Sequence, residues 1–304
     1  MIFLIAIVIV SMILLPDAAY AWGPGMHIDM AMRILADPSG VLPAISKLIT
    51  SFPADFIYGA TSPDIIVGKK YAGYHYHCHN WRMGHLILAE SKSDRQRAAS
   101  YGYLMHLAMD VVAHNYYVPF KYVRHYSTRL FSHTYWEMRF DLGVPDRAWN
   151  YLGNISRHEI EEFDELLERV LRKTLFSFRT NKRIFNSILI LQKMRGMREV
   201  LRFYASKSRW GIEDENRAQY IDLTWESARD FLANPETAQC LTADPAGLQR
   251  LDYAIKLRRR LRGMVRKHVM TVTQAEKLVV MVREHLAHGV YQPEMVMPDV
   301  EDVL

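Results

Sequence analysis

Apolar residues recur every three to four positions over most of the chain, the spacing that places them on one face of an α-helix. This pattern predicts helices over 27–36, 41–58 with a break at Pro53, 89–107, 120–140, 156–175, 182–206, 214–233, 246–268 and 272–287. Turn-forming sequences separate them, and Gly143–Asp146 is the clearest. No long stretch alternates apolar with polar residues, so the predicted fold class is all-α.

A polar stripe interrupts the apolar pattern between Tyr101 and Asp141. His106, Asp110 and His114 stand four residues apart, and His133 with Glu137 repeats that spacing. Residues four apart lie on one face of a helix, so each set would present its side chains together. Imidazole and carboxylate are ligands that suit zinc. The alternative is a pair of amphipathic helices with polar surface stripes.

Further candidate ligands precede this stretch. His27 opens the first predicted helix, and Asp64 follows Pro63 at a turn. Residues 71–81 are predicted to form an irregular aromatic-rich loop that holds three competing histidines, which are His75, His77 and His79. Several carboxylates beside several imidazoles exceed the needs of one tetrahedral ion, which indicates more than one zinc ion with a bridging aspartate.

The first residues have the pattern of a secretory signal peptide. Ile2–Leu15 is almost wholly apolar but short for a membrane span, and Ala19–Ala21 forms a small-x-small cleavage signature. We expect a signal peptide over 1–21 and a secreted or periplasmic protein; the alternative is an uncleaved N-terminal anchor in the membrane. Cleavage would make Trp22 the new N-terminus, whose amine could bind metal beside His27.

Composition and charge restrict the possible functions less than the candidate ligands do. The chain has 304 residues and a formal net charge of +5, which favours contact with anionic surfaces or substrates. Cys78 and Cys240 could form a disulfide, or Cys78 could be a free thiol near the metal; without a CxxC pattern a thiolate zinc site is not expected. The basic helix Lys256–Lys267 could touch anionic lipid or nucleic acid, or simply be a solvated face.

The ordered ligand set resembles a known family. A mature N-terminal Trp, then His, Asp, His, HxxxD, His and HxxxE is similar to the bacterial zinc-dependent phospholipases C, which include the clostridial alpha-toxins. The single-strand-specific zinc nucleases share the fold and the order but end in HxxxD. The resemblance covers roughly residues 22–140, and nothing after residue 145 looks like the toxins' lipid-binding β-sandwich.

The resemblance implies a multi-helix domain with three zinc ions in a cleft. Its implied metal ligands are Trp22, His27, Asp64, His79, His106, Asp110, His114, His133 and Glu137. Asp110 would bridge two ions, and Asp64 would orient the attacking water. His77 is the alternative to His79. The family places a histidine six residues after the aspartate of HxxxD, whereas His114 follows by four, so His125 is the alternative there.

The implied activity is phosphodiester hydrolysis by a zinc-bridging hydroxide, with glycerophospholipid as the substrate and phospholipase C as the enzyme class. Two alternatives are a single-strand-type nuclease, for which nucleic acid is a partner only as substrate, and a non-catalytic zinc-binding protein on the same scaffold. We expect a monomer with membrane-surface contact, a catalytic region over 22–210, and a C-terminal helical region over 211–304 continuous with it.

Overall fold

The computed structural model describes residues 22–66, 78–127, 136, 139–151, 157–171, 176–194, 196, 198–199, 202–203 and 214–304. The described elements are helical throughout, and no strand occurs among them, which confirms the all-α prediction. None of the helices in these ranges is long and apolar enough to cross a membrane.

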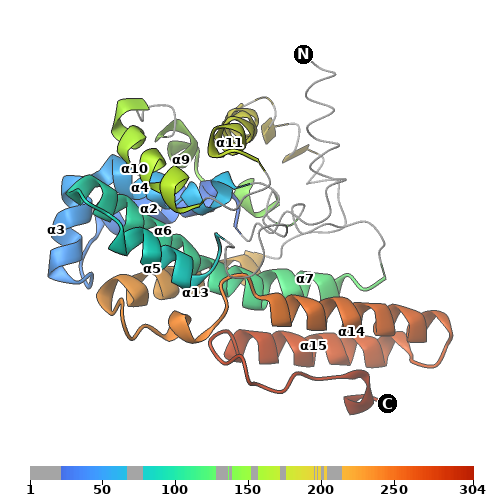
Figure 1. Ribbon diagram of the computed structural model, residues 1–304. Helices are drawn as coiled ribbons and strands as arrows, with labels where there is room; N and C mark the ends of the chain where they lie inside the picture. The colour runs from blue at the N-terminus through green and yellow to red at the C-terminus, as the bar shows by residue number, and fades with distance from the viewer. Residues whose placement is uncertain are drawn as a thin grey trace.

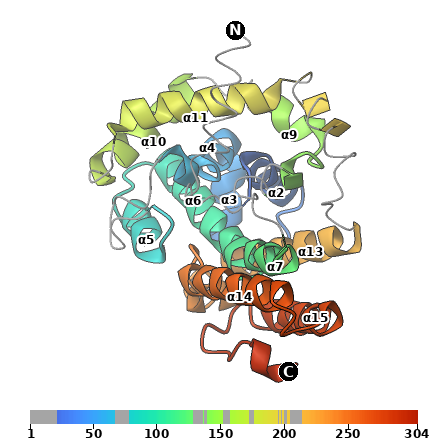
Figure 2. The same cartoon turned by 90° about the vertical axis from the view of Figure 1, so that its right-hand side faces the viewer.

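The helices follow the predicted order closely. They are α2 (Pro24–Ala36), α3 (Pro43–Ser51), α4 (Pro53–Gly59), η1 (Ser62–Ile65), α5 (Trp81–Ala89), α6 (Asp94–Val112), η4 (Ala113–Tyr117), α7 (Val118–Arg124), α9 (Asp146–Tyr151), α10 (Arg157–Val170), α11 (Phe178–Lys193), α13 (Asp214–Ala233), η5 (Gln239–Thr242), α14 (Leu248–Arg266), α15 (Val272–His288) and η6 (Val300–Asp302). Figures 1 and 2 show their arrangement, with α6 between the other helices of the N-terminal half and α14 and α15 along one side.

Helix α6 is the centre of the molecule. It packs against α3, α4, α5, α10 and α13, and nearly every residue from Ala98 to Val112 is buried. Apolar residues on all sides of a helix indicate burial on all sides. Gly102 lets α4 approach closely, because a Cβ there would lie 2.1 Å from the carbonyl oxygen of Phe56. Polar groups on α6 are therefore enclosed by protein.

The predicted boundaries were wrong at three places. The helix predicted over 89–107 begins instead at Asp94 and continues to Val112, because Ser93 caps α6 by accepting a hydrogen bond from the Gln96 amide at 3.2 Å. The gap predicted between the helices over 89–107 and 120–140 is absent, because α6, the π-helical turn η4 and α7 follow one another directly. Pro119 occupies the first turn of α7, where its missing N–H is tolerated. The helix predicted over 120–140 is interrupted, because α7 ends at Arg124 and a turn follows, whereas Trp136, Arg139 and Phe140 are helical as predicted.

The helices after residue 213 pack on the earlier ones. Helix α13 lies against α6, where Ser227 donates a hydrogen bond to the Ala108 carbonyl at 2.7 Å. Helices α14 and α15 pack on α7 and form a hairpin along one side of the molecule (Figure 1). The domain boundaries predicted from the sequence stay predictions.

Candidate metal centre

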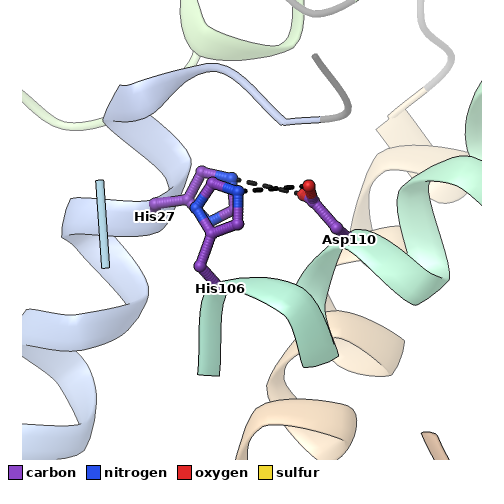
Figure 3. Close-up of side chains that lie close together, drawn as sticks. All are labelled: His27, His106 and Asp110. Atoms are coloured by element: carbon purple, nitrogen blue, oxygen red, sulfur yellow. Dashed lines mark ion pairs between the residues drawn. The ribbon is translucent and has the colours of Figure 1, made fainter. Parts of the chain in front are cut away.

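Six of the predicted ligands converge on one buried place. His27 comes from α2, Asp64 from η1, His79 from the segment before α5, His106 and Asp110 from α6, and His114 from η4. All six side chains are 0–1 % exposed. Figure 3 shows His27 stacked on His106, with both rings directed at Asp110. Elements far apart in sequence therefore build one cluster of nitrogen and oxygen atoms.

The distances in the cluster suit a tetrahedral zinc ion. Asp110 Oδ2 lies 3.1 Å from His79 Nε2 and 3.1 Å from His106 Nε2. These two nitrogens are 3.1 Å apart, and Asp64 Oδ1 is 3.3 Å from His79 Nε2 and 4.0 Å from His106 Nε2. Ligands bound tetrahedrally at about 2.0–2.1 Å would be separated by roughly 3.3 Å. Asp64, His79 and His106 form one group of possible ligands for an ion, and His27, His106 and Asp110 form another.

The protonation of His106 suits a bound cation. Its Nδ1 lies 2.8 Å from the Ala60 carbonyl oxygen, which can only accept, so Nδ1 carries the proton. Burial lowers the pKa of His106 to about 4, so the ring is neutral and Nε2 presents a lone pair. That lone pair faces the carboxylate of Asp110. Two acceptors 3.1 Å apart repel each other unless a cation lies between them.

Asp110 is the shared member of the cluster. Burial alone would raise its pKa, but the neighbouring imidazoles of His106, His27 and His79 outweigh burial and hold the pKa well below its usual range. Its Oδ1 lies 3.4 Å from Nε2 of His27, whose ring stacks on His106. No hydrogen bond to either Asp110 oxygen or to either His27 ring nitrogen is found within the described ranges. Asp110 thus lies close to His27 as well as to His79 and His106, while its role as a bridge between two ions stays a prediction.

Helix α2 is held in place by a residue that the sequence analysis did not single out. Asp141 accepts hydrogen bonds from the backbone N–H groups of Gly25 at 2.9 Å and Met26 at 3.1 Å, which replaces the side-chain cap that α2 lacks. Burial raises the pKa of Asp141 to about 7, although these N–H groups lower it. A Cβ at Gly23 would lie 2.2 Å from Asp141 Oδ2, so glycine is needed there. Asp141 therefore positions the helix turn that carries His27.

Trp22 lies next to the cluster. Its indole nitrogen donates to the Met109 carbonyl at 3.0 Å, one residue before Asp110, and its ring stacks on Tyr117 with centroids 5.0 Å apart. The side chain is fully buried. This anchoring fixes the start of the predicted mature chain beside the ligands, while a metal-binding role for its amine stays a prediction.

The remaining predicted ligands divide into two groups. His114 Nε2 lies 3.9 Å from Asp110 Oδ2, at the edge of the cluster. Its alternative, His125, stacks instead on Trp136 with centroids 4.6 Å apart. His133 and Glu137, like the alternatives His75 and His77, lie outside the described residues.

The segment around His79 is tied down by its neighbours. Tyr103 donates a hydrogen bond to the Cys78 carbonyl at 2.6 Å, and Asn80 caps α5 by accepting from the Met83 amide at 2.8 Å. Cys78 Sγ lies 3.4 Å from His79 Nδ1. Cys78 and Cys240 are both free thiols, so the structure does not contain the disulfide considered from the sequence.

A contact from the C-terminal region also supports the cluster. Gly247, which has φ of 55°, lies so close to His114 that a Cβ would be 2.3 Å from the His114 carbonyl oxygen. Asn115 donates hydrogen bonds to the carbonyls of Val111 and Asp244, each at 2.9 Å. The start of α14 therefore fixes the η4 turn.

A cavity of about 560 Å³ lies elsewhere, between α2, α9 and α13. Its lining residues are Met32, Arg33, Ala36, Asp37, Arg147, Ile221, Asp222 and Trp225. None of the predicted ligands is among them, so this cavity is separate from the metal centre.

The fold and the site together define a helical metalloprotein with a buried histidine and aspartate cluster for zinc. The sequence model of the family described as zinc-dependent phospholipase C matches residues 26–178, about half of the chain. The chain belongs to this family, as its ligand order predicted. No curated protein and no solved structure matches it significantly. The match includes every predicted ligand except Trp22.

Proposed function

We propose that this zinc-dependent phospholipase-like hydrolase is a phospholipase C that cleaves the phosphodiester bond of glycerophospholipids. The observation that carries the proposal is the buried cluster in which Asp64, His79 and His106 form one group of possible metal ligands and His27, His106 and Asp110 form another. Membership of the phospholipase C family favours phospholipid over nucleic acid as the substrate.

The cluster residues have separate roles in this proposal. His79, His106, Asp64 and Asp110 would hold one ion, and Asp110 would share a second with His27. Zinc lowers the pKa of bound water from about 15.7 to about 7 and offsets the negative charge that develops on a phosphodiester. The Ala60 carbonyl keeps the His106 lone pair directed inward, because it fixes the proton on Nδ1.

Asp64 is proposed as the general base. Its Oδ1 faces His79 Nε2 at 3.3 Å, and its carboxylate is buried, so a proton taken from the attacking water would be held away from bulk solvent. A third ion would use His114 together with His133 and Glu137. The amine of Trp22 would complete the His27 site after cleavage at Ala21, in a secreted or periplasmic protein.

The substrate can be tested with purified mature protein loaded with zinc. We expect release of the phosphorylated head group from phosphatidylcholine in mixed micelles, no cleavage of single-stranded DNA, and loss of turnover after chelation. Asp64→Asn should reduce turnover by about 100-fold or more while much of the zinc is retained. Asp94→Asn, which changes an exposed aspartate, is the matched control.

The outcomes separate the three functions. Cleavage of single-stranded DNA with little lipid turnover would assign the protein to the nuclease class. A fully zinc-loaded protein that cleaves neither substrate would be a non-catalytic zinc-binding protein. N-terminal sequencing of the exported protein, with metal analysis, tests a start at Trp22 and a content of three ions.

A further inference from the structure

The turn between α14 and α15 is rigidly built. We name residues Arg266–Val272 the hairpin tip. Helix α14 ends in a motif in which the Val269 amide donates to the Met264 carbonyl at 3.0 Å and the His268 amide to the Val265 carbonyl at 3.2 Å. Thr271 then opens α15 with a capping box. Caps on both sides leave the tip little freedom to rearrange.

Two apolar side chains project from this tip. Val269 is 60 % exposed and Val272 is 59 % exposed. In the motif that ends α14, the residue at the position of Val269 frequently packs on the preceding helical turn. Here it is held in the solvent instead. His268 has φ of 55°, in the region that favours glycine, so the turn is kept in place by its surroundings. The exposure of these valines is a property of the folded tip.

Two cations belong to the same tip as the valines. Arg266 and Lys267 are exposed, and no carboxylate within the described ranges pairs with them. Two other cations of α14 are paired, because Lys256 bonds Asp252 and Arg260 bonds Asp299 and Glu301. The sequence has no acidic residue from Tyr253 to Ala275. The tip therefore combines net positive charge with exposed apolar groups.

We propose that the hairpin tip docks the protein on an anionic phospholipid bilayer. The inference rests on the proposed function, which requires access to lipid. Unpaired cations attract anionic head groups, and small apolar side chains of the same tip can enter the interfacial layer. A nucleic acid would use the same cations but would favour aromatic or polar side chains for stacking and hydrogen bonding. The exposed apolar side chains of the tip are valines, which favours lipid.

The test is co-sedimentation with vesicles of phosphatidylcholine alone and of phosphatidylcholine with phosphatidylglycerol. We expect tighter binding to the anionic vesicles, weakened by salt. Arg266→Gln with Lys267→Gln should weaken that binding about 25-fold, since each cation near an anionic surface contributes about fivefold. The control is Lys47→Gln with Arg82→Gln, which removes two exposed cations from α3 and α5; Figure 1 shows α3 at the opposite end of the molecule from the tip.

The valines are tested separately. Val269→Ser with Val272→Ser should weaken binding several-fold at high salt, where the attraction between charges is screened. Thermal melting of each variant checks that the hairpin stays folded. Sedimentation in an Asp64→Asn background measures binding without lipid turnover, so that failure of the proposed activity is distinguished from failure of docking.

Turnover of a monomeric short-chain phosphatidylcholine should be unchanged in the tip variants, whereas turnover on anionic vesicles should fall with binding. Equal vesicle binding by wild-type, tip and control proteins would overturn the proposal. So would binding to single-stranded DNA that is tighter than binding to anionic vesicles and is lost in the same tip variant.

Discussion

Two buried charged groups, Asp110 on α6 and Arg250 on α14, have very different hydrogen-bonding surroundings. Arg250 is 5 % exposed, and its guanidinium donates hydrogen bonds to the carbonyls of Met295 at 3.3 Å, Gln292 at 2.7 Å and Gly289 at 3.5 Å. Asp110 is fully buried, yet at least one of its neighbours, His106 Nε2, presents a lone pair. Donors and acceptors are matched around Arg250, whereas acceptors meet around Asp110. The difference teaches that the chain itself completes the hydrogen bonding of Arg250, whereas the groups around Asp110 suit a bound cation.

The largest effect is expected from Asp110→Asn. The amide loses the negative charge that would be shared between two ions, so zinc content should fall and turnover should drop by about 1,000-fold or more. Metal analysis and phosphatidylcholine hydrolysis measure both quantities. Full zinc content and full activity in this variant would contradict the assignment of Asp110 as the shared ligand.

Arg250→Met tests the other side of the comparison. The change leaves buried carbonyls without donors and should lower the free energy of unfolding by about 3 kcal/mol. Denaturant unfolding measures this loss. Zinc content per folded protein should be unchanged, because the network around Arg250 is complete within the chain. A loss of zinc that accompanies the loss of stability would show that the two groups are coupled.

A smaller effect is expected from Asp141→Ala. Removal of the cap from α2 should cost about 1–2 kcal/mol of stability and weaken zinc binding at the His27 site. Asp141→Asn keeps one acceptor oxygen and should retain much of the wild-type zinc affinity. Competitive chelator titration of both variants measures this. Identical zinc affinity in the alanine variant would mean that Asp141 has no part in placing His27.

The smallest effect concerns His125. Burial, with the nearby cations of Lys121 and Arg124, lowers its pKa to about 3 from 6.5. Between those values the unfolded chain binds a proton that the folded chain does not, so stability is present above pH 6.5 and is lost as the pH falls toward 3. When the pH is lowered from 6.5 to 5, the free energy of unfolding of the wild type should fall by about 1 kcal/mol more than that of His125→Gln. Thermal melting at several pH values measures this change. A melting temperature that falls by the same amount with pH in both proteins would refute the prediction.

The contrast between Asp110 and Arg250 also shows which contacts a residue pattern in the sequence can reveal. The spacing of His106, Asp110 and His114 predicted a shared helical face, because four residues advance little more than one turn. Arg250 has no such pattern around it, since its partners are backbone carbonyls from another segment. A carbonyl that bonds a distant side chain has no signature in sequence.

The sequence by itself determined the helical class, most helix positions, the family and the order of the candidate ligands. Periodicity and residue type carry this information, because they follow from local backbone geometry. It did not determine the break between α5 and α6 or the π-helical turn at His114, where capping and the packing of Gly247 against the backbone decide.

Only the tertiary structure brought His27, Asp64 and His79 to Asp110, and only it showed that Asp141 caps α2 and that the Ala60 carbonyl sets the His106 proton. These contacts join residues separated by up to 116 positions, as between Gly25 and Asp141. Their physical reason is the close packing of helices around α6. That packing places a particular carbonyl or carboxylate within hydrogen-bonding distance and leaves the lone pairs at the centre facing one another.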